Sequence, residues 1–329
     1  MVLVSGANGA GKTNLLEALH LGTQGFSPRA RSDAQMVRFG ATAGRVALAG
    51  LNGEHRFETD VVLNPHESRR ARLNGDGLRS ADRLRHELRT LVFTPDRLAI
   101  VKGGPATRRA YLDRSLGRLL PGKAALGVEY AAAIGQRNAA LRRLAIGVSS
   151  RSALTPWTES VASLGVELVC ARLATAELLS APFAAAAEFL GLLSATLAYE
   201  GEPVSVADLE ARLEKDLERG VTGAGPHLHD LRIAAGGRDL RAYGSQGEQR
   251  LAVLALLLAE AETLEATTGI RPLVLLDDVL SELDGDRRRS LAALVSDGGQ
   301  TVVTAAAVGA FPAEPAQALV VTPGRLRVS

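Results

Sequence analysis

Apolar residues at the start of the chain change their spacing within twenty positions, and the change predicts three elements in succession. Residues 2–4 form a short apolar run typical of a buried strand, and a loop with three glycines follows. From residue 14 to residue 19 the apolar positions recur at helical spacing. We therefore expect a strand, a glycine-rich loop and a helix.

The glycine-rich loop fits the pattern G-x-x-x-x-G-K-[ST] at every fixed position. Glycine lets consecutive N–H groups point at one phosphate, because no Cβ blocks the dihedral angles required. The helix amino terminus and Lys12 supply positive charge, and the Thr13 hydroxyl is a ligand for Mg²⁺. A chance glycine turn before a lysine is the alternative, but the flanking strand and helix disfavour it. The predicted ATP-binding residues are Gly6, Ala7, Asn8, Gly9, Ala10, Gly11, Lys12 and Thr13.

Alternating polar and apolar positions predict a meander of strands after the first helix, which we expect Gly22 and Gly25 to end. The strands cover residues 47–63 and 69–79, and Asn74-Gly75 is a type I′ hairpin signal between two of them. Residues 91–96 are predicted as a buried strand ended by a proline.

The composition changes near residue 110, and as far as residue 220 the chain is rich in Ala, Leu and Arg. Helical patterns cover residues 106–119, 123–144, 157–193 and 206–219. Two short strands are then predicted, at residues 230–234 and 239–243, joined by Gly236-Gly237. We interpret residues 111–222 as a helical arm inserted between two parts of a nucleotide-binding head, 1–110 and 223–329.

Two further motifs belong to the second part of the head. Ser245, Gln246, Gly247 and Glu248 lead into a helix predicted over residues 251–265, whose free N–H groups suit an anion. An apolar strand, residues 273–276, then ends in Asp277 and Asp278. In a phosphate-loop protein the first aspartate holds Mg²⁺, and a second acid can orient or deprotonate the attacking water. Two adjacent carboxylates are unfavourable unless a cation is present, which argues against a purely structural role.

The order of these motifs is that of ABC-type ATPases, whose serine-glycine signature reaches the γ-phosphate held by a second copy. We therefore expect an α/β fold. Thr13 and Asp277 are predicted to bind Mg²⁺, and Asp278 is predicted to be catalytic. The signature residues predicted to act on the nucleotide of the second copy are Ser245, Gln246, Gly247 and Glu248. Ser281 and Asp284 then form the segment called the D-loop.

The composition excludes some classes of protein but does not indicate a function. The 329 residues carry a formal charge of only +2, so overall charge does not indicate a nucleic-acid partner. Cys170 is the only cysteine, which excludes an internal disulfide and suits a reducing compartment. No apolar run long enough to span a membrane is apparent. Seven arginines between residues 69 and 89 are either a solvated face or a track for DNA phosphates.

With these motifs the chain resembles the RecF family of bacterial recombination mediators, relatives of SMC and Rad-type ATPase heads. The run from Asp277 to Asp284 and the segment from Gly104 to Arg109 are its most specific features. Further matches, in family order, are residues 6–19, 93–113, 136–138, 223–227 and 243–250.

The resemblance implies an ABC-type ATPase head with an inserted helical arm, closing as a homodimer when ATP is bound. It implies weak, DNA-stimulated ATP hydrolysis and binding of single- and double-stranded DNA at gaps. With RecR and RecO such a protein loads recombinase in DNA repair, replication and the SOS response, in the cytoplasm near the nucleoid and without a membrane. The candidate DNA contacts are Arg69, Arg70, Arg72, Arg108 and Arg109.

The chain departs from the family or from its relatives at four places. At one of them Leu228-His229-Asp230 stands where an arginine and an acid are commoner. Family members carry a strand hairpin before the phosphate loop, whereas only five residues precede Gly6, so either the start codon has been misassigned or the sequence is cut. Asp96-Arg97 stands where two acids are usual. Thr304-Ala305 stands where transporter ATPases have a switch histidine.

Three other functions remain as alternatives. A transporter ATPase is disfavoured by the missing histidine and by the insertion, and an antiviral ATPase by the lack of an acidic nuclease module after Asp284. An SMC-like, nucleotide-gated DNA clamp without turnover or a repair role is the third, and phosphate release distinguishes it from an ATPase.

Overall fold

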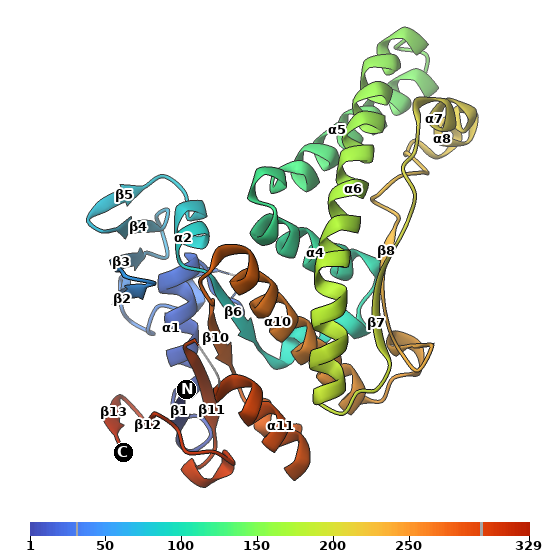
Figure 1. Cartoon of the computed structure of the whole chain (residues 1–329). Helices are drawn as coiled ribbons and strands as arrows, with labels where there is room; N and C mark the ends of the chain where they lie inside the picture. The colour runs from blue at the N-terminus through green and yellow to red at the C-terminus, as the bar shows by residue number, and fades with distance from the viewer. Residues whose placement is uncertain (31, 297–298) are drawn as a thin grey trace. The chain divides into compact units, whose positions relative to one another are not determined.

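The computed structural model describes residues 1–30, 32–296 and 299–329, coloured along the chain in Figure 1. Contacts divide these residues into two units, which we describe separately. Unit 1 contains Met1–Arg97, Phe189–Gly191 and Leu264–Ser329, and unit 2 contains Leu98–Glu188 and Leu192–Thr263. The functional division into head and arm at residues 110 and 222 stays a prediction.

Unit 1 is built on a six-stranded sheet in the order β13-β12-β1-β11-β10-β6. All neighbouring pairs are parallel except β12 with β13. Strands β6, β10 and β11 are almost wholly buried, as is usual for parallel strands covered on both faces. The carboxyl ends of β1, β10 and β11 consequently meet at one edge. The strands are β1 (Val2–Ser5), β6 (Thr90–Phe93), β10 (Leu273–Leu276), β11 (Thr301–Ala305), β12 (Gln317–Thr322) and β13 (Arg325–Val328).

Helix α1 (Lys12–Gln24) follows β1 directly and packs Leu16 into a core with Val4, Val302 and Leu275. The prediction that Gly22 helps to end this helix is wrong. Gly22 is helical, and a Cβ there would lie 2.3 Å from Cδ1 of Leu48, so the glycine permits close packing on β2. The other helices of unit 1 are η1 (Asp33–Gln35), α2 (Asp82–Glu87), η4 (Val279–Glu282), α11 (Gly285–Ser296) and η5 (Val308–Ala310), with η2 (Pro95–Leu98) at its boundary.

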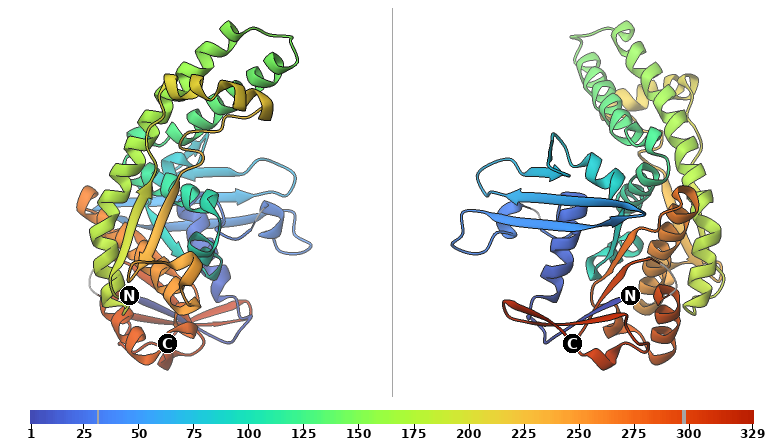
Figure 2. Two further views of the ribbon diagram at one scale, coloured as in Figure 1. Left: turned by 90° about the vertical axis from the view of Figure 1, so that its right-hand side faces the viewer. Right: turned by 60° about the vertical axis from the view of Figure 1, so that its left-hand side comes forward.

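The predicted meander is a four-stranded antiparallel sheet, seen side-on in Figure 2. Asn74 and Gly75 both have positive φ (52° and 88°), which confirms the type I′ turn. Leu21, Val61 and Leu73 are fully buried between this sheet, α1 and α2. The strands, called the meander below, are β2 (Gly44–Asn52), β3 (His55–Leu63), β4 (Arg70–Leu73) and β5 (Asp76–Leu78).

Unit 2 is mostly helical, with α5 and α6 packing through Tyr130, Val161 and Leu168. It also contains a three-stranded sheet, β7-β8-β9, whose first strand lies inside the segment predicted as helical. The elements are α3 (Ala99–Lys102), α4 (Pro105–Leu119), η3 (Pro121–Lys123), α5 (Leu126–Ala145), α6 (Arg151–Phe189), β7 (Ala195–Glu200), α7 (Val206–Ala211), α8 (Leu213–Arg219), β8 (Asp230–Ala235), β9 (Arg238–Asp239), α9 (Leu240–Tyr243) and α10 (Gln246–Thr268). The last residue of α6 and residues 264–268 of α10 belong to unit 1.

The strand predicted over residues 239–243 is wrong beyond its first residue. The Asp239 side chain accepts a hydrogen bond from the Arg241 N–H at 2.7 Å and caps the short helix α9. The turn before it is confirmed, since Gly236 and Gly237 both have positive φ. Local capping therefore replaced the predicted strand.

Helix α6 is the one described helix long and apolar enough to cross a membrane by length and composition. Buried core helices meet the same criteria, so this is weak evidence against the prediction of no membrane segment. The side of α6 that carries Val161 and Leu168 is buried in the core of unit 2.

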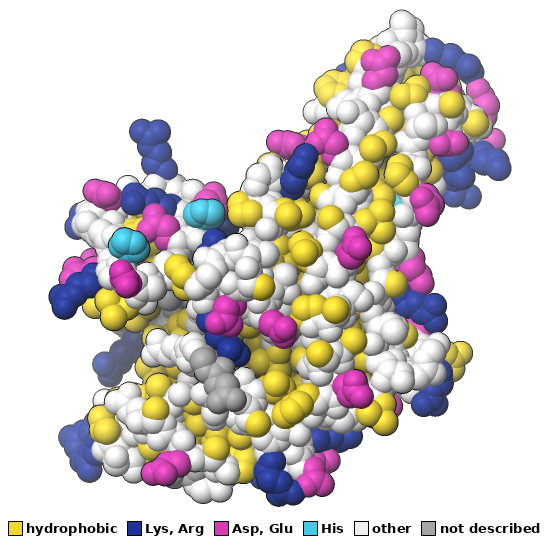
Figure 3. All heavy atoms as spheres, in the orientation of Figure 1, with side chains coloured by type: hydrophobic (Ala, Val, Ile, Leu, Met, Phe, Trp, Pro, Cys, Tyr) yellow, Lys and Arg dark blue, Asp and Glu magenta, His cyan; other side chains and the backbone are white. Residues whose placement is uncertain are grey.

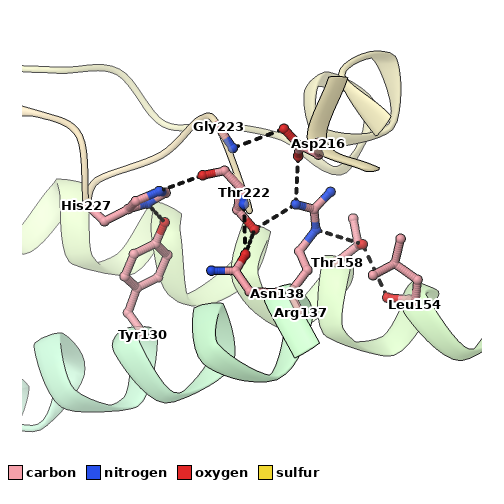
Figure 4. A network of polar contacts seen from close by, with 9 residues as sticks. All are labelled: Tyr130, Arg137, Asn138, Leu154, Thr158, Asp216, Thr222, Gly223 and His227. Atoms are coloured by element: carbon pink, nitrogen blue, oxygen red, sulfur yellow. Dashed lines mark hydrogen bonds and ion pairs between the residues drawn. The ribbon is translucent and has the colours of Figure 1, made fainter. Parts of the chain in front are cut away.

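A buried polar network joins two of the family motifs within unit 2 (Figure 4). Nη1 of Arg137 donates to Asp216 and to Thr222, both at 2.8 Å, and the side chains of Arg137 and Asp216 are each 1% exposed. Asn138 accepts from the Thr222 N–H, and Asp216 accepts from the Gly223 N–H. The motif around residue 137 thus fixes the loop that begins at residue 220.

Replacing Asp216 with alanine should destabilise the protein by about 3–5 kcal/mol, because it leaves the charge of Arg137 buried without its carboxylate. Urea unfolding followed by circular dichroism measures the change. Glu214→Ala is the matched control: its ion pair with Arg151 is exposed, and its loss should cost about 0–1 kcal/mol. Equal costs for the two variants would contradict the assignment.

Candidate nucleotide-binding site

The phosphate loop occupies the edge of the unit 1 sheet where β1 ends. Gly6, Gly9 and Gly11 all have positive φ, and Gly11 is the residue before α1. A Cβ at Gly6 would lie 2.3 Å from the carbonyl oxygen of Val321 on β12, so only glycine fits there. The loop therefore turns tightly, so that its backbone N–H groups lie beside those of the α1 amino terminus, as in an anion-binding site.

Lys12 stabilises the loop with its own side chain. Its ammonium donates to the carbonyl oxygens of Gly6 at 2.7 Å and Ala7 at 3.0 Å. The ammonium has three donors, so one remains for a phosphate oxygen while both loop contacts persist.

Thr13 and Asp277 meet at this edge although 264 residues separate them. The Thr13 hydroxyl donates to Oδ1 of Asp277 at 3.0 Å, and Asp277, at the end of β10, is 5% exposed. Neighbouring oxygen ligands of an octahedral Mg²⁺ with bonds of about 2.0–2.1 Å lie about 2.9 Å apart, so this pair fits the cation. Among the described residues no three His, Cys, Asp or Glu side chains gather as a metal site, so a cation would need phosphate or water ligands as well.

Asp278 follows with an exposed side chain and a left-handed backbone, φ 49° and ψ 31°. Its N–H donates to Oγ1 of Thr304 at 2.8 Å, and the Thr304 hydroxyl donates to Oδ1 of Asp277 at 2.9 Å. The two predicted acids thus have different surroundings, Asp277 buried and hydrogen-bonded, Asp278 open.

A cavity of ≈310 Å³ beside α1 was not predicted from the sequence. Asn14 and Glu17 of α1 line it, opposite Met36, Arg38 and Val46. The cavity begins one residue beyond Thr13 and combines apolar and polar walls. No local motif marks it, because its walls come from a helix, a loop and the meander.

The signature residues lie in unit 2, at the start of α10. Ser245 and Glu248 form a capping box: the Ser245 N–H donates to Oε2 of Glu248 at 2.7 Å, and the Glu248 N–H donates to Oγ of Ser245 at 3.2 Å. Gln246 and Gly247 lie in the first turn of α10, which begins five residues before the predicted start at residue 251.

The D-loop residues of unit 1 have local structural roles. The Ser281 hydroxyl donates to the Asp278 carbonyl at 3.0 Å, and Asp284 accepts from the Arg287 N–H at 2.9 Å, which caps α11.

The five candidate DNA-binding arginines have different surroundings. Arg70 and Arg72 are exposed on β4, in a region where Figure 3 shows basic and acidic side chains interleaved. Arg69 is half-buried and paired with Asp33. Arg108 is 4% exposed and forms a bidentate ion pair with Asp230 at 2.6–2.7 Å, which removes it from the candidates.

Arg109 lies beside Arg108 in a cluster of unit 2 that includes the family's Gly-Pro-His motif. It donates to the carbonyl of His229 at 2.6 Å. His227 bridges Tyr130 and the carbonyl of Thr222, and burial lowers the pKa of His227 below its ordinary value. This motif therefore stabilises a loop, and nothing in its geometry suggests catalysis.

A parallel sheet that ends in a phosphate loop, with a buried aspartate beside the loop threonine, defines an ATPase head of the P-loop class. The chain matches the family described as RecF/RecN/SMC N terminal domain over residues 1–321. The DNA replication and repair protein RecF of Heliobacterium modesticaldum is 36% identical over 325 residues, 94% of this chain and 87% of that protein. The RecF of Anaeromyxobacter sp. strain K is 43% identical over 306 residues, 87% and 80% of the two proteins. The chain belongs to the RecF family.

Solved structures agree with this assignment. The recombination mediator protein RecF-ATPrS in the RecFOR pathway has a TM-score of 0.84 and 28% identity, covering 99% of this chain and 91% of that chain. The Smc head domain of Pyrococcus furiosus, with a TM-score of 0.59 and 18% identity over 100% and 89% of the chains, shares the fold alone. The predicted ABC-type head is confirmed.

Replacing Gly6 with alanine should destabilise the protein by more than about 1 kcal/mol, because the new Cβ meets the Val321 carbonyl. It should also abolish binding of a fluorescent ATP analogue, since the loop must open. Gly77→Ala in the meander, where a Cβ meets nothing within 4 Å, is the control. Wild-type binding by Gly6→Ala would refute this account of the loop.

Proposed function

We propose that this chain binds ATP with Mg²⁺ and hydrolyses it slowly while acting on gapped DNA in recombinational repair. The observation that carries the proposal is the contact of Thr13 with Asp277 beside a complete phosphate loop. Membership of the RecF family supports it, because solved RecF relatives are described with ATP and with ATPrS.

The roles of the site residues follow from their positions. Lys12 and the loop N–H groups bind the β- and γ-phosphates, and the cavity beside α1 receives the ribose and base. Thr13 and Asp277 hold Mg²⁺, which neutralises charge on the phosphates. Asp278, exposed next to the buried Asp277, orients and deprotonates the attacking water.

A homodimer completes the site. Ser245 and the N–H groups at the start of α10 bind the γ-phosphate held by a second copy, with Gln246, Gly247 and Glu248 around them. The capping box supports this role, because it holds Ser245 at a helix amino terminus, where anions are stabilised. ATP binding closes the dimer and hydrolysis reopens it.

The partners follow from the family. We propose binding to single- and double-stranded DNA at gaps, DNA-stimulated hydrolysis, and cooperation with RecR and RecO in loading recombinase and in the SOS response. Such a protein works in the cytoplasm near the nucleoid. Arg72 is the best-placed DNA contact, since it is exposed on β4; Arg70 lies two residues away on the same face but pairs with Glu67 at 2.8 Å.

Replacing Asp278 with asparagine should lower kcat about 100-fold or more while leaving ATP binding intact, because the general base is lost and the phosphate loop is unchanged. Asparagine also tolerates the left-handed backbone at this position. The dimer should then persist with ATP and Mg²⁺. Phosphate release and light scattering after size exclusion measure the two effects.

Lys12→Arg is the binding-deficient control for that experiment. The planar guanidinium cannot reproduce the two contacts to the loop carbonyls and a third to phosphate. Normal turnover by Asp278→Asn would refute the assignment of the base. Binding without turnover in the wild-type protein would favour the nucleotide-gated clamp.

Arg72→Ala should weaken binding to gapped duplex DNA and lower the slope of log affinity against log salt by about 1, as expected for one lost phosphate contact. Fluorescence anisotropy with ATP and Mg²⁺ over a salt series measures this. Arg45→Ala removes the same charge from the same sheet, but Arg45 is bound to Asp60 by two contacts of 2.9 Å. An equal loss for both variants would show a general charge effect and refute a direct contact by Arg72.

A further inference from the structure

Thr304 contacts both aspartates of the site, although no sequence motif assigns it a role. It lies near the end of β11, the strand between β1 and β10, and its side chain is fully buried. The register pairs Thr304 with Val4 on β1, while Leu276 on β10 pairs with Val303. Thr304 therefore stands between the strand that enters the phosphate loop and the strand that ends in the two aspartates.

One hydroxyl joins both aspartates. Oγ1 of Thr304 accepts from the Asp278 N–H at 2.8 Å and donates to Oδ1 of Asp277 at 2.9 Å. The direction of both bonds is fixed, because an N–H only donates and an ionised carboxylate only accepts.

These two bonds set what the aspartates can do. Oδ1 of Asp277 is the atom that also accepts from Thr13, so the bond from Thr304 orients the carboxylate toward the phosphate loop. Asp278 has a left-handed backbone that residues other than glycine seldom adopt, and such a conformation persists only where its surroundings hold it. The bond to Thr304 is the contact that holds its N–H.

We propose that Thr304 is a positioning residue for ATP hydrolysis, holding the Mg²⁺ ligand Asp277 and the base Asp278 in their working geometry. Thr304-Ala305 stands where transporter ATPases have a switch histidine, and Thr304 acts through its contacts with the two aspartates. This inference rests on the proposed ATPase function, and it adds a residue to that site.

The test compares Thr304→Val, which keeps the shape and removes the hydroxyl, with Thr304→Ser, which keeps the hydroxyl. Valine should lower kcat about 10- to 100-fold, the usual cost of losing a hydrogen bond to a metal ligand. Serine should restore most of the rate. Binding of a fluorescent ATP analogue gives a second readout: in EDTA the valine variant should match the wild type, and with Mg²⁺ it should bind about tenfold less tightly.

Thr301→Val is the matched control, because Thr301 is 2% exposed at the opposite end of the same strand. Its kcat and Mg²⁺ dependence should stay those of the wild type, and thermal unfolding checks every variant. Should Thr304→Val not fold, the pair Thr304→Ala and Thr304→Ser makes the same comparison.

Wild-type kcat in the folded valine variant, or a serine variant as slow as valine, would overturn the role of Thr304 alone. A wild-type protein that neither binds nor hydrolyses ATP would overturn the proposed function, and this inference with it.

Discussion

The hydrogen bond between Thr13 and Asp277 is the contact on which the rest of the site depends. It joins the first helix to a strand near the other end of the chain, and it can form only if β1, β11 and β10 are parallel and in register. Parallel strands need long crossover connections, and here the connection from β1 to β10 contains the meander and all of unit 2. The insertion of a large helical segment is therefore compatible with the site, because both flanking strands are anchored in one sheet.

Three buried arginines of unit 2 serve folding. Arg108 pairs with Asp230, Arg137 with Asp216 and Arg172 with Asp113, and each of these arginine side chains is at most 4% exposed. A buried ion pair adds little net stability against an apolar alternative, but losing one partner is costly. Such pairs also have directional geometry, so they fix which loops meet, as Arg137 does for the loop that begins at residue 220.

The local motifs, and through them the meeting of Thr13 with Asp277, could be predicted from the sequence, whereas the long-range contacts outside these motifs could not. The phosphate loop, the aspartates after β10 and the turns at Asn74-Gly75 and Gly236-Gly237 depend on neighbouring residues, so the sequence contains their signal. Strand β7 was missed because it pairs with β8, about 35 residues later in the chain. Its run of alternating polar and apolar residues is also short, and it follows a helix of 39 residues. Arg108 could not be distinguished from an exposed arginine, because its partner Asp230 is 122 positions away. The sequence marked Thr304-Ala305 only as the place of an absent switch histidine, because the contacts of Thr304 exist only when β11 lies between β1 and β10.

Lys12 shows how much of the site is arranged by one chain before a second copy contributes. The ammonium donates two hydrogen bonds to loop carbonyls and has a third donor for a phosphate oxygen, so it stabilises the loop conformation that a phosphate would bind. Preorganised donors need little rearrangement when a phosphate arrives, so unit 1 alone has what phosphate binding requires. The signature serine belongs to unit 2, and in the dimer that we propose its hydroxyl and the helix N–H groups would stabilise the charge that develops on the γ-phosphate. In the proposed dimer, binding can therefore precede closure, and hydrolysis that uses the serine of the second copy would follow it.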